Sequence, residues 1–475
     1  MTLLRALAGL IAIVFLSDQP APTPAPELSP DEISQIEGVL QTAPDQGFGP
    51  DAFGLARAKA DLASLDALRQ TAGQSELAEA AIAYAAAEHG QRLTPGRFEP
   101  DWALRPEPYD ARAEFAAALM DHQLATWLAQ LPPPDPAYQA LTEAYGRYGA
   151  IAAQGGWPSV PSKSKPGDRG PQVAALRARL AVEDPTVGPG ADYDDVLQGA
   201  VTRAEARFGL EQNGIAGPDL IAALDVTAED RVKQIVANLE RRRWTPRAPQ
   251  PLRAEVNIAD ASLIFLEPGQ PPLTMRVVVG QPTKRTPMMA DHITSAVLNP
   301  PWNVPPGIAR KEIWPKIHGN PGYMRRAGYV VKANGQLQQR PGPKSSLGLI
   351  KFNLGNPFGV YLHDTPEKVY FSKDKRALSH GCIRLEQPNQ LAVLLLRDDP
   401  RWSADSLQAA IDTGKTAYVR VNAQPAVYVA YWTVLPDPDG AVGFRDDVYG
   451  WDQMLIDKLA GRQGRTEETV IAAAP

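Results

Sequence analysis

The sequence predicts a multidomain α+β chain with a helical N-terminal domain, a small three-helix module and a mostly β C-terminal domain. Three observations lead to this class. Apolar residues recur at helical spacing in the first third of the chain, a loop rich in Pro, Ser, Lys and Gly follows, and the pattern changes to short apolar runs and alternation from residue 251 onward. The length of 475 residues suits about three domains of roughly 150 residues each.

The first 26 residues have the pattern of an export signal. Arg5 precedes an apolar run of eleven residues, 6–16, and a Pro-rich stretch follows. Such a run is short for a bilayer span and is typical of a secretory signal. No clear Ala-x-Ala cleavage site follows it, so both a cleaved signal and an uncleaved anchor remain open. We expect residues 1–26 to be a signal peptide or signal anchor plus a Pro-rich linker, and the chain to be exported.

Residues 27–155 are expected to form the helical domain. Ala and Leu recur at helical spacing in 53–70, 75–90 and 110–131, and Tyr84, Met120 and Trp127 on these faces are interpreted as core residues. The net charge of −6 gives no general basic surface, so nucleic-acid binding is not expected.

A loop at 155–170 marks the next boundary, and a module at 163–227 follows it. Its segments "GDRGPQVAALRARL", "AVTRAEARFGL" and "NGIAGPDLIAAL" give three short helices in an order that resembles the peptidoglycan-binding module of wall enzymes. The Gln and Thr positions usual in that module hold other residues here. Glycan binding and a plain helical spacer therefore both remain open. A connecting helix at 228–250 ends in "RRRW", which we interpret as a solvated helix end with favourable cations.

The C-terminal domain is expected at residues 251–423. Strand patterns occur in "AEVNIADASLIFL", "TMRVVVG", "FGVYLHD", "KVYFS" and "AYVRV". A mixed, partly basic segment at 307–342 interrupts these strands, and we expect it to be a mobile cap over a cleft. Residues 424–462, with a hairpin signal at "PDPDG", are expected to extend the β domain, and residues 463–475 to be a disordered tail.

Cys382, in "LSHGCIRLEQP", is the single cysteine of the chain. It has no partner for an internal disulfide, and a zinc site needs more soft or imidazole ligands than this stretch supplies, so we expect no metal. The remaining choices are inert packing and a reactive thiol. In an exported protein an unused solitary thiol is a liability, because oxidising compartments favour paired cysteines or none.

The residues around Cys382 favour the reactive thiol. His363 and His380 lie within nineteen residues of it, and an imidazole within reach activates a thiol and carries its proton. In an extended segment His380 and Arg384 would point to the same side as Cys382, and Arg384 would orient a substrate carboxylate or stabilise local carbonyls. Gly381 lets the backbone approach a carbonyl closely, and the amides of Gly381 and Cys382 would hold an oxyanion.

"YLHDTP" followed by "SHGCIRLEQPNQLA" resembles the signature of the YkuD-type L,D-transpeptidase catalytic domain. The flanking "MRVVVGQPTKRTP", "AVLNPPWNVP" and "PGPKSSLGLIKF" are similar to the large periplasmic murein L,D-transpeptidases, which add a helical scaffold domain and a peptidoglycan-binding-like module. The resemblance implies Cys382 as nucleophile and His363 as proton donor and acceptor, with the ring oriented by the backbone carbonyl of Asp364. The supporting residues that it implies are His380, Gly381, Arg384, Tyr361 and Ser379.

The reaction implied by the resemblance is acyl transfer in two steps without a cofactor. Cys382 attacks the L-centre carbonyl of a tetrapeptide stem, the terminal D-Ala leaves, and the side-chain amine of a neighbouring stem resolves the thioester as a 3→3 cross-link. Peptidoglycan stems would be donor and acceptor, in the periplasm of a Gram-negative bacterium, with inner-membrane attachment if the signal is uncleaved. The resemblance also implies acylation by carbapenems and names no protein partner.

Three alternatives stay open at the level of the sequence. The same fold can serve an L,D-carboxypeptidase or an enzyme that attaches a protein to the wall, because the motif does not encode the acyl acceptor. A non-catalytic wall-binding scaffold requires a dispensable Cys382. An unrelated cysteine protease is disfavoured, because the local order around Cys382 and His363 is not of that kind.

Overall fold

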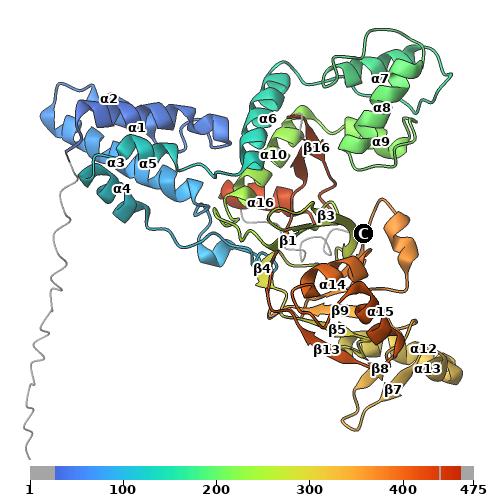
Figure 1. Cartoon of the computed structure of the whole chain (residues 1–475). Helices are drawn as coiled ribbons and strands as arrows, with labels where there is room; N and C mark the ends of the chain where they lie inside the picture. The colour runs from blue at the N-terminus through green and yellow to red at the C-terminus, as the bar shows by residue number, and fades with distance from the viewer. Residues whose placement is uncertain (1–26, 438–439, 462–475) are drawn as a thin grey trace, which may run out of the picture.

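The computed structural model describes residues 27–437 and 440–461, and Figure 1 shows a helical body, a separate three-helix module and a strand-rich body beneath them. The predicted signal or anchor at 1–26 and the predicted tail at 463–475 lie outside the described residues. Within the described ranges, every helix is too short or too polar to cross a membrane. The class is a multidomain α+β chain, with a helical N-terminal region and a mostly β C-terminal region.

The N-terminal helices pack around a core of their own. This core contains Ile36, Leu77 and Tyr84, which are fully buried. Met120, the last residue of its helix, is 75% exposed, so its prediction as a core residue is wrong. The elements are α1 (Pro30–Thr42), η1 (Ala43–Gln46), α2 (Leu55–Leu62), α3 (Ala67–Glu88), η2 (Pro95–Arg97), α4 (Ala111–Met120) and α5 (Leu124–Ala129).

Two longer helices, α6 (Pro136–Ala153) and α10 (Ala228–Arg242), pack against each other and connect the bodies. Figure 1 shows them side by side between the helical body and the three-helix module. Tyr138 and Leu141 of α6 belong to the core of the module rather than to that of the N-terminal helices. The helical region 27–155 therefore contributes to two cores.

The three arginines that begin "RRRW" are buried, so their interpretation as a solvated helix end is wrong. Arg241, Arg242 and Arg243 are 2%, 8% and 4% exposed. Their ion-pair partners are acidic residues far away in the sequence: Asp452 for Arg241, Asp135 for Arg242, and Glu88 for Arg243. The basic run is therefore an internal junction between the domains.

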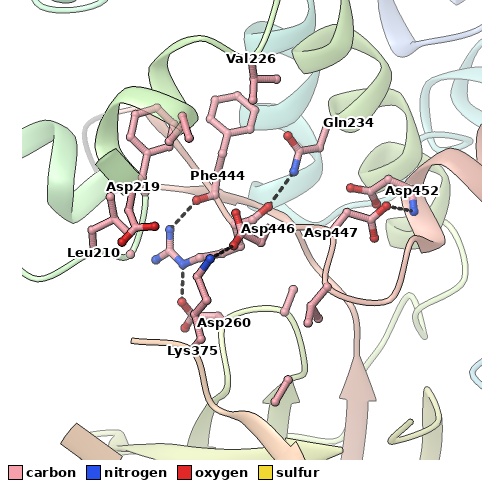
Figure 2. A pocket seen from close by; sticks show the side chains of 18 of the residues that line it. Leu210, Asp219, Val226, Gln234, Asp260, Lys375, Phe444, Asp446, Asp447 and Asp452 are labelled. Atoms are coloured by element: carbon pink, nitrogen blue, oxygen red, sulfur yellow. Dashed lines mark hydrogen bonds and ion pairs between the residues drawn. The ribbon is translucent and has the colours of Figure 1, made fainter. Parts of the chain in front are cut away.

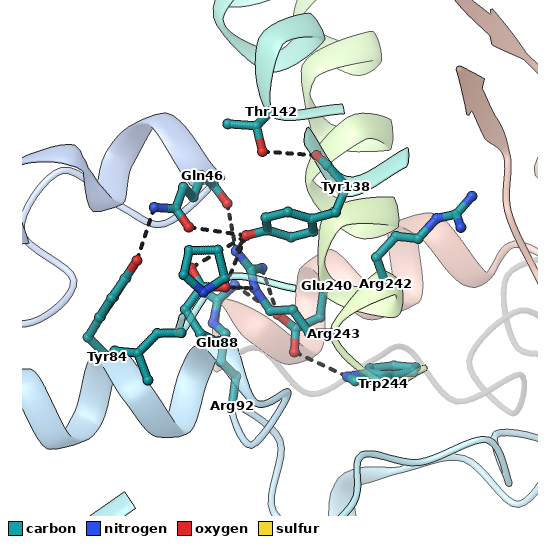
Figure 3. Close-up of polar contacts among 12 residues, drawn as sticks. Gln46, Tyr84, Glu88, Arg92, Tyr138, Thr142, Glu240, Arg242, Arg243 and Trp244 are labelled. Atoms are coloured by element: carbon teal, nitrogen blue, oxygen red, sulfur yellow. Dashed lines mark hydrogen bonds and ion pairs between the residues drawn. The ribbon is translucent and has the colours of Figure 1, made fainter. Parts of the chain in front are cut away.

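Arg243 lies at the centre of a buried polar cluster where α3, α6 and α10 meet (Figure 3). Its Nε donates to Glu88 Oε2 at 3.0 Å and its Nη2 donates to the Tyr138 hydroxyl at 2.7 Å. Glu240 lies 3.4 Å from its Nη1, and all three charged side chains are fully buried. Burial raises the pKa of Tyr138, so the hydroxyl stays protonated and donates to Glu88.

The three-helix module contains α7 (Pro171–Ala181), α8 (Asp195–Arg207) and α9 (Pro218–Leu224). Val173, Leu176 and Leu180 form one apolar face of α7 and are fully buried. A hairpin of β15 (Val434–Pro436) and β16 (Val442–Phe444) completes this core, with Val434 and Phe444 buried in it. The C-terminal extension thus packs against the module.

The C-terminal body is built on a strongly curled sheet with the strand order β13-β5-β9-β10-β12-β3-β2-β1-β14-β4, and β11 also pairs with β3. Val277, Phe352 and Leu362 are fully buried in its core. The strands are β1 (Arg253–Asn257), β2 (Ser262–Leu266), β3 (Leu273–Gly280), β4 (Met289–His292), β5 (Ser295–Leu298), β9 (Ile350–Asn353), β10 (Leu362–His363), β11 (Ala377–Ser379), β12 (Ile383–Leu385), β13 (Ala417–Arg420) and β14 (Ala426–Ala430).

Helices α14 (Pro388–Leu396), α15 (Ala404–Asp412) and α16 (Trp451–Leu459) complete this body, and α16 packs on α10. Strand β14 lies between β1 and β4, so the segment after residue 423 supplies an interior strand of the sheet. The predicted strand "KVYFS" is instead a short helical turn, η4 (Lys368–Ser372). Thr365 Oγ1 accepts from the Glu367 amide at 3.2 Å just before this turn, and Phe371 is its buried side chain.

The segment predicted as a cap is a small folded unit with its own apolar cluster. Val304, Ile313 and Leu337 are buried in this cluster. We call residues 302–339 the cap unit; in Figure 1 it lies at the lower right, beyond the main sheet. It contains β6 (Trp302–Asn303), α11 (Pro306–Ile308), η3 (Ala309–Ile313), α12 (Trp314–Gly319), α13 (Pro321–Arg326), β7 (Tyr329–Val331) and β8 (Leu337–Gln339).

Candidate active site

Three adjacent strands bring the predicted site residues together. In β10, His363 is the register partner of Lys351 in β9 and of Arg384 in β12. The preceding row, Leu362 with Phe352 and Ile383, is fully buried in the core. Because side chains alternate between the two faces of a strand, the row of His363, Lys351 and Arg384 faces away from that core.

Cys382 lies two residues before Arg384 and Tyr361 two residues before His363, so both extend this polar face. The Ile383 amide donates to the Tyr361 carbonyl at 3.1 Å, which fixes the two segments beside each other. The Tyr361 hydroxyl contacts the Cys382 sulfur, and the Tyr361 ring lies 5.5 Å from the His363 ring. The return of the chain between His363 and Cys382, which the sequence makes conceivable, is thus present.

The thiol of Cys382 is half-buried and protonated at rest. Burial raises its pKa above the ordinary 9.0, although contacts from Tyr361 and the charges of Lys351 and Arg384 act in the opposite direction. Besides its contacts with Tyr361, the sulfur has a long contact to the Gly359 carbonyl oxygen, at 3.9 Å.

His363 is buried and neutral. Its burial lowers its pKa to about 3, and the positive charge of Arg384 acts in the same direction. Its Nδ1 lies 2.5 Å from the backbone carbonyl oxygen of Asp364, which is the carbonyl named from the family resemblance. Since a carbonyl only accepts, Nδ1 carries the proton and Nε2 has the free lone pair. The resting pair is therefore a thiol and a neutral imidazole.

The side chain of Asp364 supports the strand rather than the imidazole. Its Oδ2 accepts from the Leu349 amide at 2.8 Å, and its Oδ1 lies 2.7 Å from Lys368 Nζ. Gly348 has a φ of +62°, and a Cβ at this residue would lie only 2.3 Å from Asp364 Oδ2. A glycine is therefore required where this loop passes over the carboxylate.

The chain bends sharply between Ser379 and Cys382. Ser379 Oγ donates to the Cys382 carbonyl at 2.6 Å and accepts from the Gly381 amide at 3.0 Å. Gly381 has a φ of +109°, which favours glycine. The expectation that His380 and Cys382 share one side of an extended segment is therefore wrong, and so is a free Gly381 amide in an oxyanion hole.

A second layer that the sequence did not indicate supports this bend. Thr286 Oγ1 donates to the Gly381 carbonyl at 2.8 Å and accepts from the Gly280 amide at 2.9 Å. Tyr449, from the C-terminal extension, accepts from the Thr286 amide and donates to the Gly280 carbonyl at 2.5 Å. Only the flanking "QPTKRTP" motif could have pointed to Thr286, and no local signal points to Tyr449.

His380 connects the bend to the cap unit. Its Nε2 lies 2.6 Å from Glu312 Oε1 in η3, and Lys284 Nζ lies 2.8 Å from the same oxygen. Burial would raise the pKa of Glu312, but its contacts with Lys284 and His380 outweigh burial and lower it. Glu312 is thus ionised and joins the cap unit to the cysteine-bearing loop.

Arg384 is already engaged within the protein. Its guanidinium forms an ion pair with Glu367 and lies 5.6 Å from the centroid of the Tyr370 ring. Lys351, which the sequence analysis did not single out, is half-buried with its Nζ 4.1 Å above the Tyr361 ring. Burial lowers its pKa, and the charge of Cys382 acts in the opposite direction. A lysine between the buried Ile350 and Phe352 is the signal that could have identified it.

Two cavities lie beside the module, and Cys382 lines neither. One, of about 430 Å³, is formed by α9, α10 and the turn at 258–261 (Figure 2), and its lining includes Arg445, which is bound to Asp260. Ala377, which begins the strand leading to Cys382, is in its wall. In the described part of the chain, no group of three or more His, Cys, Asp or Glu side chains is arranged to hold a metal ion.

Two family models match the chain. Residues 251–409 match the L,D-transpeptidase catalytic domain and residues 28–144 match the Scaffold domain. A Haemophilus influenzae protein named "Putative L,D-transpeptidase" is 30% identical over 220 residues, which cover 42% of this chain. The chain spans 44% of the length of that relative.

Similar solved structures include two L,D-transpeptidases. That of Xylanimonas cellulosilytica is 16% identical, with a TM-score of 0.19, and the match covers 57% of this chain and 100% of that one. L,D-transpeptidase 3 of Mycobacterium tuberculosis is 15% identical, with a TM-score of 0.20, and the match covers 38% of this chain and 61% of that one.

Proposed function

We propose that this chain is an L,D-transpeptidase that forms 3→3 cross-links in peptidoglycan. Its residues 251–409 match the L,D-transpeptidase catalytic domain, and its residues 28–144 match the Scaffold domain. The observation that carries the proposal is the placement of Cys382 directly before β12, the strand that pairs with the His363 strand β10, with the Tyr361 hydroxyl on the sulfur. The substrate would be a tetrapeptide stem in the periplasm of a Gram-negative bacterium.

In the first step the Cys382 sulfur attacks the L-centre carbonyl of the donor stem. Because both partners are neutral at rest, the thiol proton passes to His363 Nε2 as the carbon–sulfur bond forms. The carbon–nitrogen bond to the terminal D-Ala then breaks, and His363 returns the proton to the leaving amine. The product of this step is a thioester and free D-Ala.

In the second step the side-chain amine of a neighbouring stem attacks the thioester. His363 takes a proton from that amine, the carbon–sulfur bond breaks, and the proton returns to the Cys382 sulfur. The peptide-bond energy is conserved through the thioester, so no ATP is consumed. A carbapenem would acylate the same sulfur by opening of its lactam ring.

Incubation of the protein with disaccharide tetrapeptides, followed by mass spectrometry, tests the proposal. We expect cross-linked dimers and released D-Ala, and neither with Cys382→Ala. Tripeptides without dimers would favour the L,D-carboxypeptidase. Thioester formation that only a protein lysine resolves would favour attachment of a protein to the wall. A Cys382→Ala variant that yields as many cross-linked dimers as the wild type would favour a non-catalytic scaffold.

A further inference from the structure

We propose that Lys351 is the residue that binds the C-terminal carboxylate of the acyl donor and so makes the enzyme select a stem with a free terminal D-Ala. This inference deepens the proposed function and rests on it. From the sequence, Arg384 is expected either to orient a substrate carboxylate or to stabilise local carbonyls, and the contacts of the two cations favour Lys351 for the carboxylate.

Two cations act on the Cys382 thiol, Lys351 and Arg384. The charge of Arg384 is compensated by its ion pair with Glu367, and its guanidinium is also held against the Tyr370 ring. Binding a substrate carboxylate with Arg384 would require this ion pair to be broken or shared. Arg384 is therefore a poor receptor for a further anion.

Lys351, in contrast, has no anionic partner in the described part of the chain. Its contacts there are the face of the Tyr361 ring, at 4.1 Å, and the electrostatic influence of the thiol. A half-buried ammonium without a counter-ion loses part of its solvation. This loss disfavours the charged form and lowers the pKa of Lys351. Such an uncompensated charge beside the thiol indicates a place where an anion arrives.

The position of the ammonium suits the leaving group of the donor. Tyr361 contacts both groups, with its hydroxyl on the Cys382 sulfur and its ring under Lys351 Nζ. The ammonium and the sulfur therefore contact the same tyrosine side chain. In a terminal D-Ala the carboxylate carbon follows the scissile carbonyl carbon after a nitrogen and one Cα, a reach of about 4 Å. The distances are compatible with one donor stem contacting both groups.

Register fixes this arrangement. Lys351 is the partner of His363 across β9 and β10, so the cation, the base and the nucleophile occupy one face of three hydrogen-bonded strands. Binding of the carboxylate would bring a negative charge to the site as the donor arrives. It would also hold the leaving amine near His363, which returns the proton to it.

The test compares two donors on the full-length protein: a disaccharide tetrapeptide with a free C-terminal carboxylate and the same stem with a C-terminal carboxamide. Acylation of Cys382 is followed by mass spectrometry. We expect the wild type to prefer the free acid. Lys351→Met should lower kcat/KM for the acid by about 10- to 100-fold, mainly through KM, and change that for the amide by less than about twofold. Lys351→Arg should retain most of the preference.

Lys415→Met is the matched control, because Lys415 is an exposed lysine of the same body and its removal should change neither donor. Equal losses with both donors in Lys351→Met would mean that Lys351 serves the thiolate rather than the donor carboxylate, and would overturn the inference. If the wild type accepts both donors equally, the inference about Lys351 is overturned and the proposed function stands. A wild type that accepts neither overturns the proposed function as well.

Discussion

At the scale of single residues, the resting protonation state of Cys382 can be measured directly. Its pKa is raised by burial, and His363 beside it is neutral, so the free protein holds little thiolate at neutral pH. We expect the rate of alkylation by iodoacetamide to keep rising from about pH 6 to beyond about pH 9. A plateau reached near neutral pH would instead indicate a thiolate–imidazolium pair. His363→Gln should leave the profile nearly unchanged.

The neutral His363 also predicts how stability depends on pH. Its folded pKa of about 3 lies below the ordinary 6.5, so the unfolded chain binds a proton that the folded chain does not. The free energy of unfolding should therefore fall as the pH is lowered from about 6.5 toward about 3. In His363→Gln this part of the decrease is absent. Urea unfolding at about pH 7.5 and about pH 5 measures the difference between the two slopes, and equal slopes would contradict the prediction.

The sequence identified the site residues that lie together in short motifs, and missed those that distant segments bring to the site. Tyr361, His363 and Cys382 lie within short motifs, and their placement follows from two adjacent strands. Thr286 and Tyr449 support the same bend from segments about 95 and 70 residues away from it, where no local pattern could reveal them. The Gly381 amide was misjudged because its bond to Ser379 depends on a bend that a strand pattern does not encode.

At the scale of elements, the cap unit has a core separate from that of the main sheet and touches the cysteine-bearing loop through Glu312. We propose that it closes over the bound stem. Glu312→Gln removes the charge that both His380 and Lys284 contact, so we expect KM for the donor to rise by about threefold to tenfold with little change in kcat. Steady-state kinetics with the disaccharide tetrapeptide measure both.

Glu367→Gln is not a suitable control for this variant, because Glu367 pairs with Arg384 inside the site. Glu143→Gln on α6 removes an exposed carboxylate far along the chain and should leave both constants unchanged. A fall in kcat with constant KM for Glu312→Gln would mean that the carboxylate acts on the chemistry and not on capture of the stem.

The sequence predicted where most helices and strands lie along the chain better than it predicted which of their residues are buried and what they contact. Amphipathic spacing identified the helices of the N-terminal region and of the module, because a packed helix must present an apolar stripe. The interpretation of "RRRW" as a solvated helix end is wrong, since a buried arginine differs from an exposed one only through partners such as Asp452, which lies 211 residues away from Arg241. The strand predicted for "KVYFS" from its alternation is also wrong, because only one side chain of that segment is buried.

At the scale of the whole molecule, the buried cluster around Arg243 holds the N-terminal helices against α6 and α10. Arg243→Met leaves Glu88 buried without its counter-ion, whereas Glu240 keeps its ion pair with Arg92, so we expect a loss of about 3–5 kcal/mol in the free energy of unfolding. Differential scanning calorimetry and urea unfolding measure this loss. Adding Glu88→Gln to the same variant should recover part of it, because one uncompensated charge is removed.

Arg203→Met is the matched control for this experiment, because Arg203 pairs with Asp184 on the exposed side of α8. A surface ion pair contributes about 0–1 kcal/mol, so this variant should unfold almost like the wild type. If Arg243→Met were equally harmless, the bodies would be held together by apolar contacts, with the polar cluster adding little.

The register of β9, β10 and β12 determines which changes of chain length the site tolerates. A residue inserted within β9 would exchange Lys351 for Ile350 or Phe352 beside His363 and would turn the ammonium toward the apolar core. The same insertion in the exposed part of the connection, around Gly355, would leave both rows of partners aligned across the three strands. Length variation is therefore compatible with an intact site between these strands but not within them, and libraries for engineering the enzyme should place insertions and deletions accordingly.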